Sequence, residues 1–297
     1  MSKPNTLCIL GCGNLGTAIL QSLLTSPSQL FTQYIACVQS NSSSERLQSQ
    51  FGPNASLKIS TGDNASAIKA ADVVILALDP SAIERGLTQP GIADALSSKL
   101  LISVAAGWTR QKIEETLYGS STAENENEND RAFVIRTLPT IPALVGQSLT
   151  SIEIEPDRQI PQQYLDLTDA IFSRVGKTVH VPPNLLNPAT AVAGSTPAMF
   201  AVIVDALVDA AVAVGMPRAT ATTMIVQSMA GSAAMMQNGM TAAELRDQGT
   251  SPEGCTIGGL MVLEENGVRG GVGRALREAV TLARIMDGVR HVNDTRE

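Results

Sequence analysis

The most chemically suggestive segment lies near the C-terminus, at residues 249–260, and reads GTSPEGCTIGGL. Its Gly, Ser and Pro residues stand directly before an apolar run, residues 257–263. This order predicts a loop at the start of a helix, where about four amide N–H groups lack partners and a partial positive charge collects. A small carboxylate would fit there, and Thr256 offers a hydroxyl beside it.

A plainer interpretation of the same residues is an ordinary capped helix. Thr250 or Ser251 would then supply the cap, and Pro252 would lie in the first turn. The N-terminal part of the chain bears on this choice.

A second segment, Gly11-Cys12-Gly13-Asn14-Leu15-Gly16, lies between an apolar run at 6–10 and an amphipathic pattern at 17–24. A GxGxxG pattern placed between a strand and a helix is typical of a dinucleotide site. Gly11 allows the tight turn, Gly13 lets a pyrophosphate approach the backbone, and Gly16 lets the helix pack on the strand. The alternative is a glycine-rich turn without function.

The end of the second predicted strand, residues 34–38, indicates which cofactor fits. An NAD-preferring site usually has Asp or Glu there, to hold the ribose 2′-hydroxyl. Here Gln39, Ser40 and Asn41 are followed by Glu45 and Arg46. Neutral donors beside an arginine favour the 2′-phosphate of NADPH, while Glu45 leaves NADH as an alternative.

The elements that would position these segments alternate between strands and helices. Further apolar strands are predicted at 72–78, 100–107, 132–138 and 178–181, and helical patterns at 65–70, 83–87, 110–117 and 163–175. Continuous apolar strands suit a parallel sheet covered on both faces. We therefore predict a Rossmann-type doubly wound α/β domain over residues 1–181. The acidic run 120–131 is expected to be a solvated insertion.

Beyond residue 181 the strand signals vanish and alanine and methionine dominate, so an all-α domain is predicted over residues 182–297. Its helices are expected at 186–193, 197–214, 218–237, 241–248, 255–265 and 270–290. The helix at 197–214 carries only Asp205 and Asp209, and we expect it to be buried rather than to span a membrane. Helices apolar on several faces need many neighbours, which favours a homodimer over a compact monomer.

Composition narrows the class of protein. The 297 residues carry a net charge of -7, which disfavours nucleic acid as a partner. With only His180 and His291, no metal site is expected. Cys8, Cys12 and Cys37 lie in or beside predicted strands and, like Cys255, form no CxxC pair, as expected of reduced thiols. No signal-like segment opens the sequence, so a cytoplasmic location is expected.

A nicotinamide site implies hydride transfer to C=O or C=N. Carbonyl reduction needs a proton donor, typically Lys, His or Tyr. The last lysine is Lys177 and the last tyrosine Tyr164, so the predicted helical domain has neither. A cyclic imine arrives already protonated. Its reduction requires the enzyme only to position the ring, to bind the substrate carboxylate and to give the ring nitrogen a hydrogen-bond partner.

The chain resembles the pyrroline-5-carboxylate reductase family over nearly its whole length. Besides residues 9–16, the resemblance rests on Ala77-Leu78-Asp79-Pro80, Val104-Ala105-Ala106-Gly107, Arg136-Thr137-Leu138-Pro139, Ala193-Gly194-Ser195-Thr196-Pro197-Ala198 and Thr250-Ser251-Pro252-Glu253-Gly254-Cys255-Thr256. The resemblance implies a Rossmann domain, a helical dimerisation domain, possible larger homo-oligomers, and NAD(P)H-dependent reduction of a cyclic imino acid to proline.

Carried over by position, the resemblance also implies site residues. Cofactor binding is expected at Gly11, Gly13, Asn14, Leu15, Gly16, Ser40, Asn41, Asn64, Ala77, Leu78, Pro80 and Ala105. The substrate carboxylate is expected on the N–H groups of Gly254, Cys255 and Thr256, with Ser251 nearby. The Thr256 hydroxyl is expected to hydrogen-bond the ring nitrogen.

Several positions depart from the family pattern. The family usually has Lys at the position of Asp79, Gly at those of Thr196 and Glu253, and Tyr at that of Met199. These departures leave room for a substituted pyrroline carboxylate as substrate. Two other readings stay open: a two-domain NADP-dependent dehydrogenase of a hydroxyacid or ketoacid, and a catalytically silent NADPH-binding protein.

Overall fold

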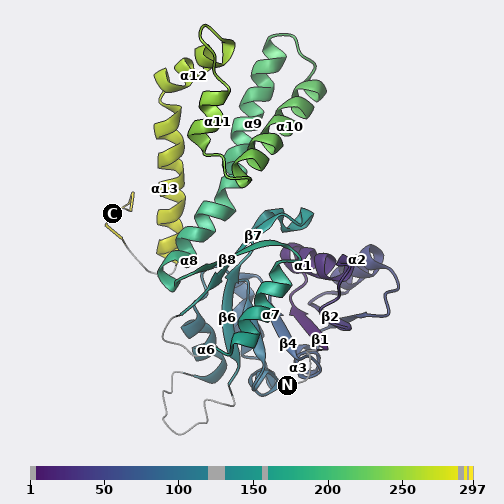
Figure 1. Ribbon diagram of the computed structural model, residues 1–297. Coiled ribbons are helices and arrows are strands. Elements are labelled where there is room, and N and C mark those ends of the chain that lie inside the picture. Colours follow the sequence, from purple (N-terminus) through teal and green to yellow (C-terminus); the bar gives the residue numbers. More distant parts are fainter. Residues whose placement is uncertain (1–4, 120–130, 156–159, 287–290, 293, 297) are drawn as a thin grey trace. The chain divides into compact units, whose positions relative to one another are not determined.

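A computed structural model describes residues 5–119, 131–155, 160–286, 291–292 and 294–296 (Figure 1). Most of the predicted acidic insertion at 120–131 lies outside these residues. The chain forms two compact units, Met1–Gly194 with Leu282–Arg290, and Ser195–Thr281 with His291–Glu297. The first unit therefore extends past the domain boundary predicted at residue 181.

The first unit is built on one eight-stranded sheet with the order β3-β2-β1-β4-β5-β6-β7-β8. The strands are β1 (Thr6–Leu10), β2 (Gln33–Val38), β3 (Leu57–Thr61), β4 (Val73–Leu76), β5 (Leu100–Ser103), β6 (Phe133–Leu138), β7 (Ser148–Glu153) and β8 (Gly176–Val181). All neighbours are parallel except β6 and β7, which are antiparallel. Strands β1 to β3 are added to the sheet in one direction, and β4 to β8 are added in the opposite direction from the other side of β1. β1, between β2 and β4, is therefore the topological switch point.

Helices cover both faces of this sheet, as the continuous apolar strands predicted (Figure 1). They are α1 (Asn14–Thr25), α2 (Asn41–Phe51), α3 (Asn64–Lys69), α4 (Ile83–Leu87), α5 (Ile92–Leu96), α6 (Arg110–Tyr118) and α7 (Gln162–Phe172), with the short 3₁₀ turns η1 (Pro80–Ala82) and η3 (Ile141–Val145). Alternate residues of β1 enter opposite cores: Leu7 and Ile9 lie in one, Cys8 and Leu10 in the other. Cys8, Cys12 and Cys37 are buried free thiols, as predicted, and Cys255 is an exposed one.

Four helices and strands of this unit were absent from the sequence-based prediction: α2, α5, β3 and β7. The sequence of α2, NSSSERLQSQF, buries only Leu47, so its apolar signal is a single residue. β3 is an edge strand with no fully buried residue. β7 is buried, but its sequence SLTSIE is mostly polar, and the hydroxyls of Ser148 and Thr150 find partners in the core.

The elements that the structure describes in the second unit are all helices. α8 (Pro183–Ala189) and the π turn η4 (Thr190–Ser195) lead into it. α9 (Thr196–Ala213), α10 (Arg218–Gln237), α11 (Ala242–Gln248), α12 (Cys255–Glu265) and α13 (Val268–Met286) follow, and α13 belongs to the first unit from Leu282 on. The predicted helix at 270–290 overlaps α13, which begins two residues earlier, and residues 287–290 lie outside the described part. α9 and α10 pack against each other as neighbours in the chain.

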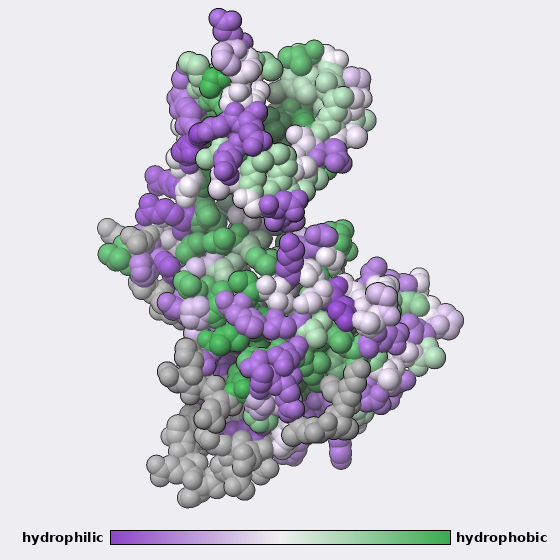
Figure 2. Space-filling model, viewed as in Figure 1, coloured by the Kyte–Doolittle hydropathy of each residue, from purple (hydrophilic) through white to green (hydrophobic). Residues whose placement is uncertain are grey.

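The apolar helices of this unit are largely exposed in the single chain (Figure 2). Val208 alone is buried in α9 and Ala221 alone in α10, while none of the residues of α12 is buried. Val202 is 71% exposed and Met261 58%. The expectation that the helix at 197–214 is buried is therefore wrong for the isolated chain.

Candidate active site

The carboxyl end of β1 opens into a groove of about 450 Å³ at the switch point of the sheet. The loop that follows β1 is fixed by its backbone, because the N–H groups of Gly11 and Cys12 both donate to the carbonyl of Cys37 at the end of β2. Residues 11–14 line the groove. Ligands of open α/β sheets bind at this place in the fold.

The start of α1 faces this groove, and the amides of its first turn have no acceptor among the described residues. Its N-cap is Gly13, which contributes no side-chain hydrogen bond, and the first turn holds no acidic residue. A Cβ added to Gly13 would meet nothing within 4 Å. Space next to uncapped N–H groups is what a bound pyrophosphate requires, so these residues fit a dinucleotide.

Gly11 and Gly16 serve packing instead. Gly11 has φ +104°, and a Cβ there would lie 2.7 Å from the carbonyl oxygen of Ala77. A Cβ on Gly16 would lie 2.3 Å from the carbonyl oxygen of Gly11. Gly16 therefore permits the close approach of α1 to β1, and Gly11 permits the close approach of the loop to the segment that follows β4.

The structure brings half of the predicted cofactor residues to the groove. These are Gly11, Gly13, Asn14, Asn64, Ala77 and Leu78. The others do not line it: Leu15 packs on the core, Gly16 supports the loop, Pro80 begins η1, and Ala105 is buried. Ser40 and Asn41 begin α2, where the Ser40 hydroxyl accepts the N–H of Ser43 at 3.2 Å. The cofactor-binding roles of these residues stay predictions.

Arg46 has a different role from the one its sequence position indicated. Its guanidinium donates to the carbonyl of Cys12 at 2.6 Å and to the hydroxyl of Thr17 at 3.3 Å. It lines the groove, but it is engaged with the glycine loop. The side chain of Arg46 therefore stabilises the loop and the start of α1.

The groove has twelve further lining residues: Cys12, Cys37, Val38, Gln39, Ser43, Arg46, Gly62, Asp79, Ala82, Arg85, Gly86 and Gln89. Of these, the four on the α4 side, Ala82, Arg85, Gly86 and Gln89, were not predicted from the sequence as part of the site. Asp79 accepts from the N–H and hydroxyl of Ser81, and these hydrogen bonds lower the pKa of its carboxyl. The helical spacing of 82, 85, 86 and 89 was the available signal, since these positions share one face.

The predicted helix start in the second unit exists, and a tight turn leads into it. The N–H of Gly254 donates to the carbonyl of Ser251 at 3.0 Å. Pro252 stands at the second turn position, and Glu253 has φ +61° at the third. A turn with Pro there followed by a positive φ is type II, whose third position favours glycine. Glu253 thus holds a conformation disfavoured by its side chain, and that side chain is exposed.

This turn changes which backbone amides are available to bind the substrate carboxylate. Because the N–H of Gly254 is used in the turn, the amides left without a backbone acceptor among the described residues are those of Cys255, Thr256 and Ile257. α12 has Gly254 as its N-cap, no side-chain cap and no acidic residue in its first turn. The hydroxyls of Ser251 and Thr256 also have no hydrogen-bond partner in the described part of the chain.

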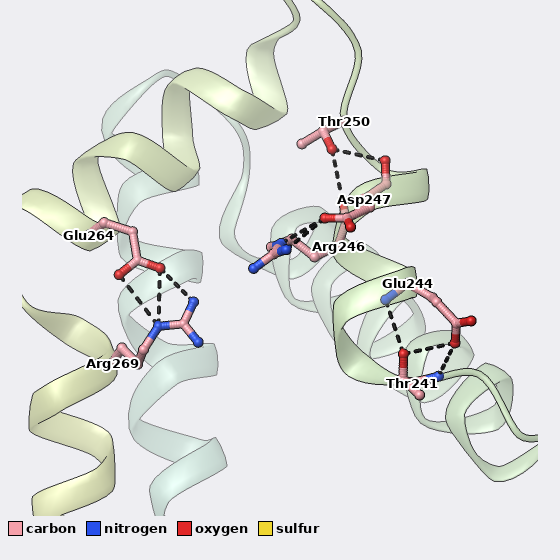
Figure 3. Close-up of polar contacts among 7 residues, drawn as sticks. All are labelled: Thr241, Glu244, Arg246, Asp247, Thr250, Glu264 and Arg269. Carbon is pink, nitrogen blue, oxygen red and sulfur yellow. Dashed lines mark hydrogen bonds and ion pairs between the residues drawn. The ribbon is translucent and has the colours of Figure 1, made fainter.

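Neighbouring polar contacts hold the segment in place (Figure 3). The hydroxyl of Thr250 turns back to the carbonyls of Arg246 and Asp247 and closes the end of α11. At the other end of α12, Glu264 pairs with Arg269 at 2.6 Å. Thr250 is therefore committed to the preceding helix and does not cap α12, contrary to the plainer interpretation of its sequence.

The two units together define a nicotinamide-dinucleotide oxidoreductase with a helical oligomerisation region. Residues 6–107 match the family model described as NADP oxidoreductase, coenzyme F420-dependent. Residues 183–286 match the model described as pyrroline-5-carboxylate reductase dimerisation.

Curated relatives match over the full length. The chain is 40% identical to a pyrroline-5-carboxylate reductase of Lophium arboricola, over 98% of this chain and 96% of that protein. It is 34% identical to that of Neurospora crassa, over 99% and 97%. The chain belongs to the pyrroline-5-carboxylate reductase family.

Solved structures show the same fold. The pyrroline-5-carboxylate reductase of Coxiella burnetii matches with a TM-score of 0.80 at 25% identity, over 97% of this chain and 100% of that one. The pyrroline carboxylate reductase of Plasmodium falciparum, solved with NADP bound, matches with a TM-score of 0.79 at 23% identity, over 96% and 99%.

The open space at Gly13 gives a first prediction. Gly13→Val should fold normally, because nothing lies within 4 Å of the added Cβ, yet raise the Kd for NADPH at least 100-fold by filling the pyrophosphate site. Titration calorimetry measures the Kd, and thermal unfolding checks the fold. Gly16→Ala is the contrasting variant, with a lower Tm from overpacking. Unchanged affinity of the valine variant would show that the loop is only a turn.

The positive φ of Glu253 gives a second prediction. Glu253→Gly should have a free energy of unfolding about 1 kcal/mol higher than Glu253→Ala, because both lose the carboxylate but only glycine relieves the left-handed conformation. Denaturant unfolding of both variants at one protein concentration measures the difference. Equal stabilities would refute strain at this turn.

Proposed function

We propose that this protein catalyses the NADPH-dependent reduction of 1-pyrroline-5-carboxylate to L-proline. The observation that carries the proposal is the start of α12, where three amides and two hydroxyls have no partner among the described residues. The chain that contains this helix matches a pyrroline-5-carboxylate reductase over 98% of its length. Among the described residues, the groove at α1 offers a second uncapped helix start for the cofactor.

The residues at α12 bind and orient the substrate. Its carboxylate accepts hydrogen bonds from the amides of Cys255, Thr256 and Ile257, aided by the partial positive charge of the helix start. Ser251 flanks the same seat. Holding the carboxylate fixes the position of the ring and its C=N bond.

The hydroxyl of Thr256 serves the ring nitrogen. The imine arrives protonated, so its N–H⁺ donates to the Thr256 oxygen, which orients the ring and stabilises the charge. The reduced nicotinamide supplies a hydride to the C=N carbon when bound. The product is a neutral amine that takes a proton from water, and no acidic side chain is required.

The absence of a need for an acidic side chain distinguishes imine reduction from the reduction of a ketoacid's carbonyl group to a hydroxyacid. A hydroxyacid or ketoacid reductase needs a proton donor at the forming alkoxide. The residues after Lys177 include no lysine, and His291 is the only histidine after His180. Absorbance loss at the nicotinamide band, on mixing the protein with NADPH and pyrroline-5-carboxylate, tests the proposal. Methylated pyrroline carboxylates in the same assay test a substituted substrate, and tight NADPH binding without turnover would identify a silent binding protein.

Thr256 provides the sharpest test of the mechanism. Thr256→Ala should lower kcat/KM by the equivalent of about 1–3 kcal/mol, because one hydrogen bond to the reacting group is lost. Thr256→Ser keeps the hydroxyl and should retain most activity. Thr256 is exposed, so neither change should alter folding in circular dichroism. Unchanged kinetics of the alanine variant would remove Thr256 from the mechanism.

The protein is further proposed to act as a homodimer through its C-terminal helices. The dimerisation family match at 183–286 supports homo-oligomerisation. It covers the one described helical stretch that is long and apolar enough to cross a membrane, Pro183–Ala213, of whose most apolar window only 11% is buried in the single chain. A second copy would cover this exposed apolar surface.

A charge within that surface should break the dimer. Val202→Asp places a carboxylate at a position that is 71% exposed in the single chain and is expected to be buried in the dimer. Light scattering should report about twice 31.1 kDa for the wild type and a mass near 31.1 kDa for the variant. Lys112→Asp, on the surface of α6, is the control. A monomeric wild type would contradict the proposal.

A further inference from the structure

Two arginines line the dinucleotide groove, Arg46 and Arg85. Arg46 is bound to the carbonyl of Cys12 and the hydroxyl of Thr17, both in the segment that carries the glycine loop. Moving Arg46 to a ligand would leave the Cys12 carbonyl without this charged donor. The guanidinium of Arg46 is therefore occupied by hydrogen bonds to protein acceptors.

Arg85 is differently placed. It lies on α4, is exposed, and has no hydrogen bond or ion pair to any residue that the structure describes. The other groove residues on this segment are Ala82, Gly86 and Gln89, which with Arg85 follow the spacing of one helical face. This face of α4, with the flanking residues Ala82 and Gln89, forms one wall of the groove, called the α4 wall below.

The backbone of this wall is fixed close to the sheet. A Cβ on Gly86 would lie 2.4 Å from Cδ1 of Leu78, so α4 packs closely on the segment that follows β4. At the end of the wall, Gln89 accepts a hydrogen bond from the side-chain amide of Asn64 at 3.2 Å. Arg85 thus projects from a supported helix.

The groove also contains the end of β2, where the ribose 2′ group of a dinucleotide binds. Gln39 and Ser43 line it there, and both are uncharged. Asp79 is the only carboxylate among the lining residues, and its hydrogen bonds from Ser81 occupy one of its oxygens. A doubly charged phosphate in this groove needs a cation that is not already bound.

We propose that Arg85 recognises the 2′-phosphate of NADPH from the α4 wall, opposite the segment at which the sequence pattern places such a residue. Gln39 and Ser43 donate the accompanying neutral hydrogen bonds. Arginine suits this role because its planar fork can donate two parallel hydrogen bonds to phosphate. The inference rests on the proposed use of NADP(H) and names the residue that selects it.

Binding of the cofactors alone tests this assignment. Titration calorimetry with NADPH, NADH, 2′,5′-ADP and 5′-AMP is carried out on the wild type, Arg85→Ala and Arg85→Lys. Arg85→Ala should weaken NADPH and 2′,5′-ADP at least tenfold and change NADH and 5′-AMP less than twofold. Arg85→Lys should recover part of the affinity. Glu84→Ala, the neighbouring residue that does not line the groove, is the control and should leave all four constants unchanged.

Other outcomes overturn the assignment in recognisable ways. Equal weakening of NADPH and NADH would mean that Arg85 stacks on the adenine, which both cofactors share. No change with either cofactor would place Arg85 outside the site. Equal affinity of the wild type for both cofactors would refute both Arg85 selection and the choice of NADPH. Reduction of pyrroline-5-carboxylate with NADH would then survive, and the activity assay with each cofactor records it separately.

Discussion

This protein's proposed chemistry depends on two helix starts whose backbone amides have no acceptor among the described residues. α1 and α12 both follow a glycine N-cap, have no side-chain cap and carry no acidic residue in the first turn. By contrast, Ser40, Thr109 and Thr241 cap α2, α6 and α11 with their own oxygens. An oxygen from the protein would occupy the place of a ligand oxygen, so the bare helix start is what makes each site receptive to an anion.

Keeping a helix start bare requires support from elsewhere. Around α1 that support comes from close packing at Gly11 and Gly16 and from the guanidinium of Arg46 on the Cys12 carbonyl. Around α12 it comes from a type II turn and from the Thr250 hydroxyl, which faces back to α11. The turn contains Glu253 at a position where the backbone favours glycine. The family pattern of glycine there follows from the turn geometry, whereas nothing in the structure explains the choice of glutamate.

The helical unit shows a second constraint, the need to cover apolar surface. Its helices are rich in Ala, Val and Met, and in one chain most of these side chains face solvent. A domain of this size cannot surround every helix with its own neighbours, so a partner copy is the simplest source of the missing contacts. Folding of this unit and association of the subunits are therefore expected to be coupled.

Much of the fold could be predicted from sequence because its signals are local. β1, the glycine loop and α1 follow one another directly, and the start of α12 follows from six consecutive residues, so backbone preferences alone specify them. Strands buried on both faces were predicted for the same reason. α2, β3 and β7 were missed because one buried leucine, an edge strand and a run of serines and threonines leave little apolar pattern.

What the sequence by itself determined was the pair of helix starts that follow a glycine N-cap and the order of the elements around them. The tertiary structure alone decided which side chains meet across the groove. Arg46 and Arg85 are 39 positions apart in the sequence, yet they line one cavity. Only the packing of the chain brings Arg46 to the carbonyl of Cys12 in the glycine loop and leaves Arg85 available to a ligand. Local sequence fixes the conformation of a helix start, whereas the partner of a long charged side chain depends on distances between segments remote in the chain.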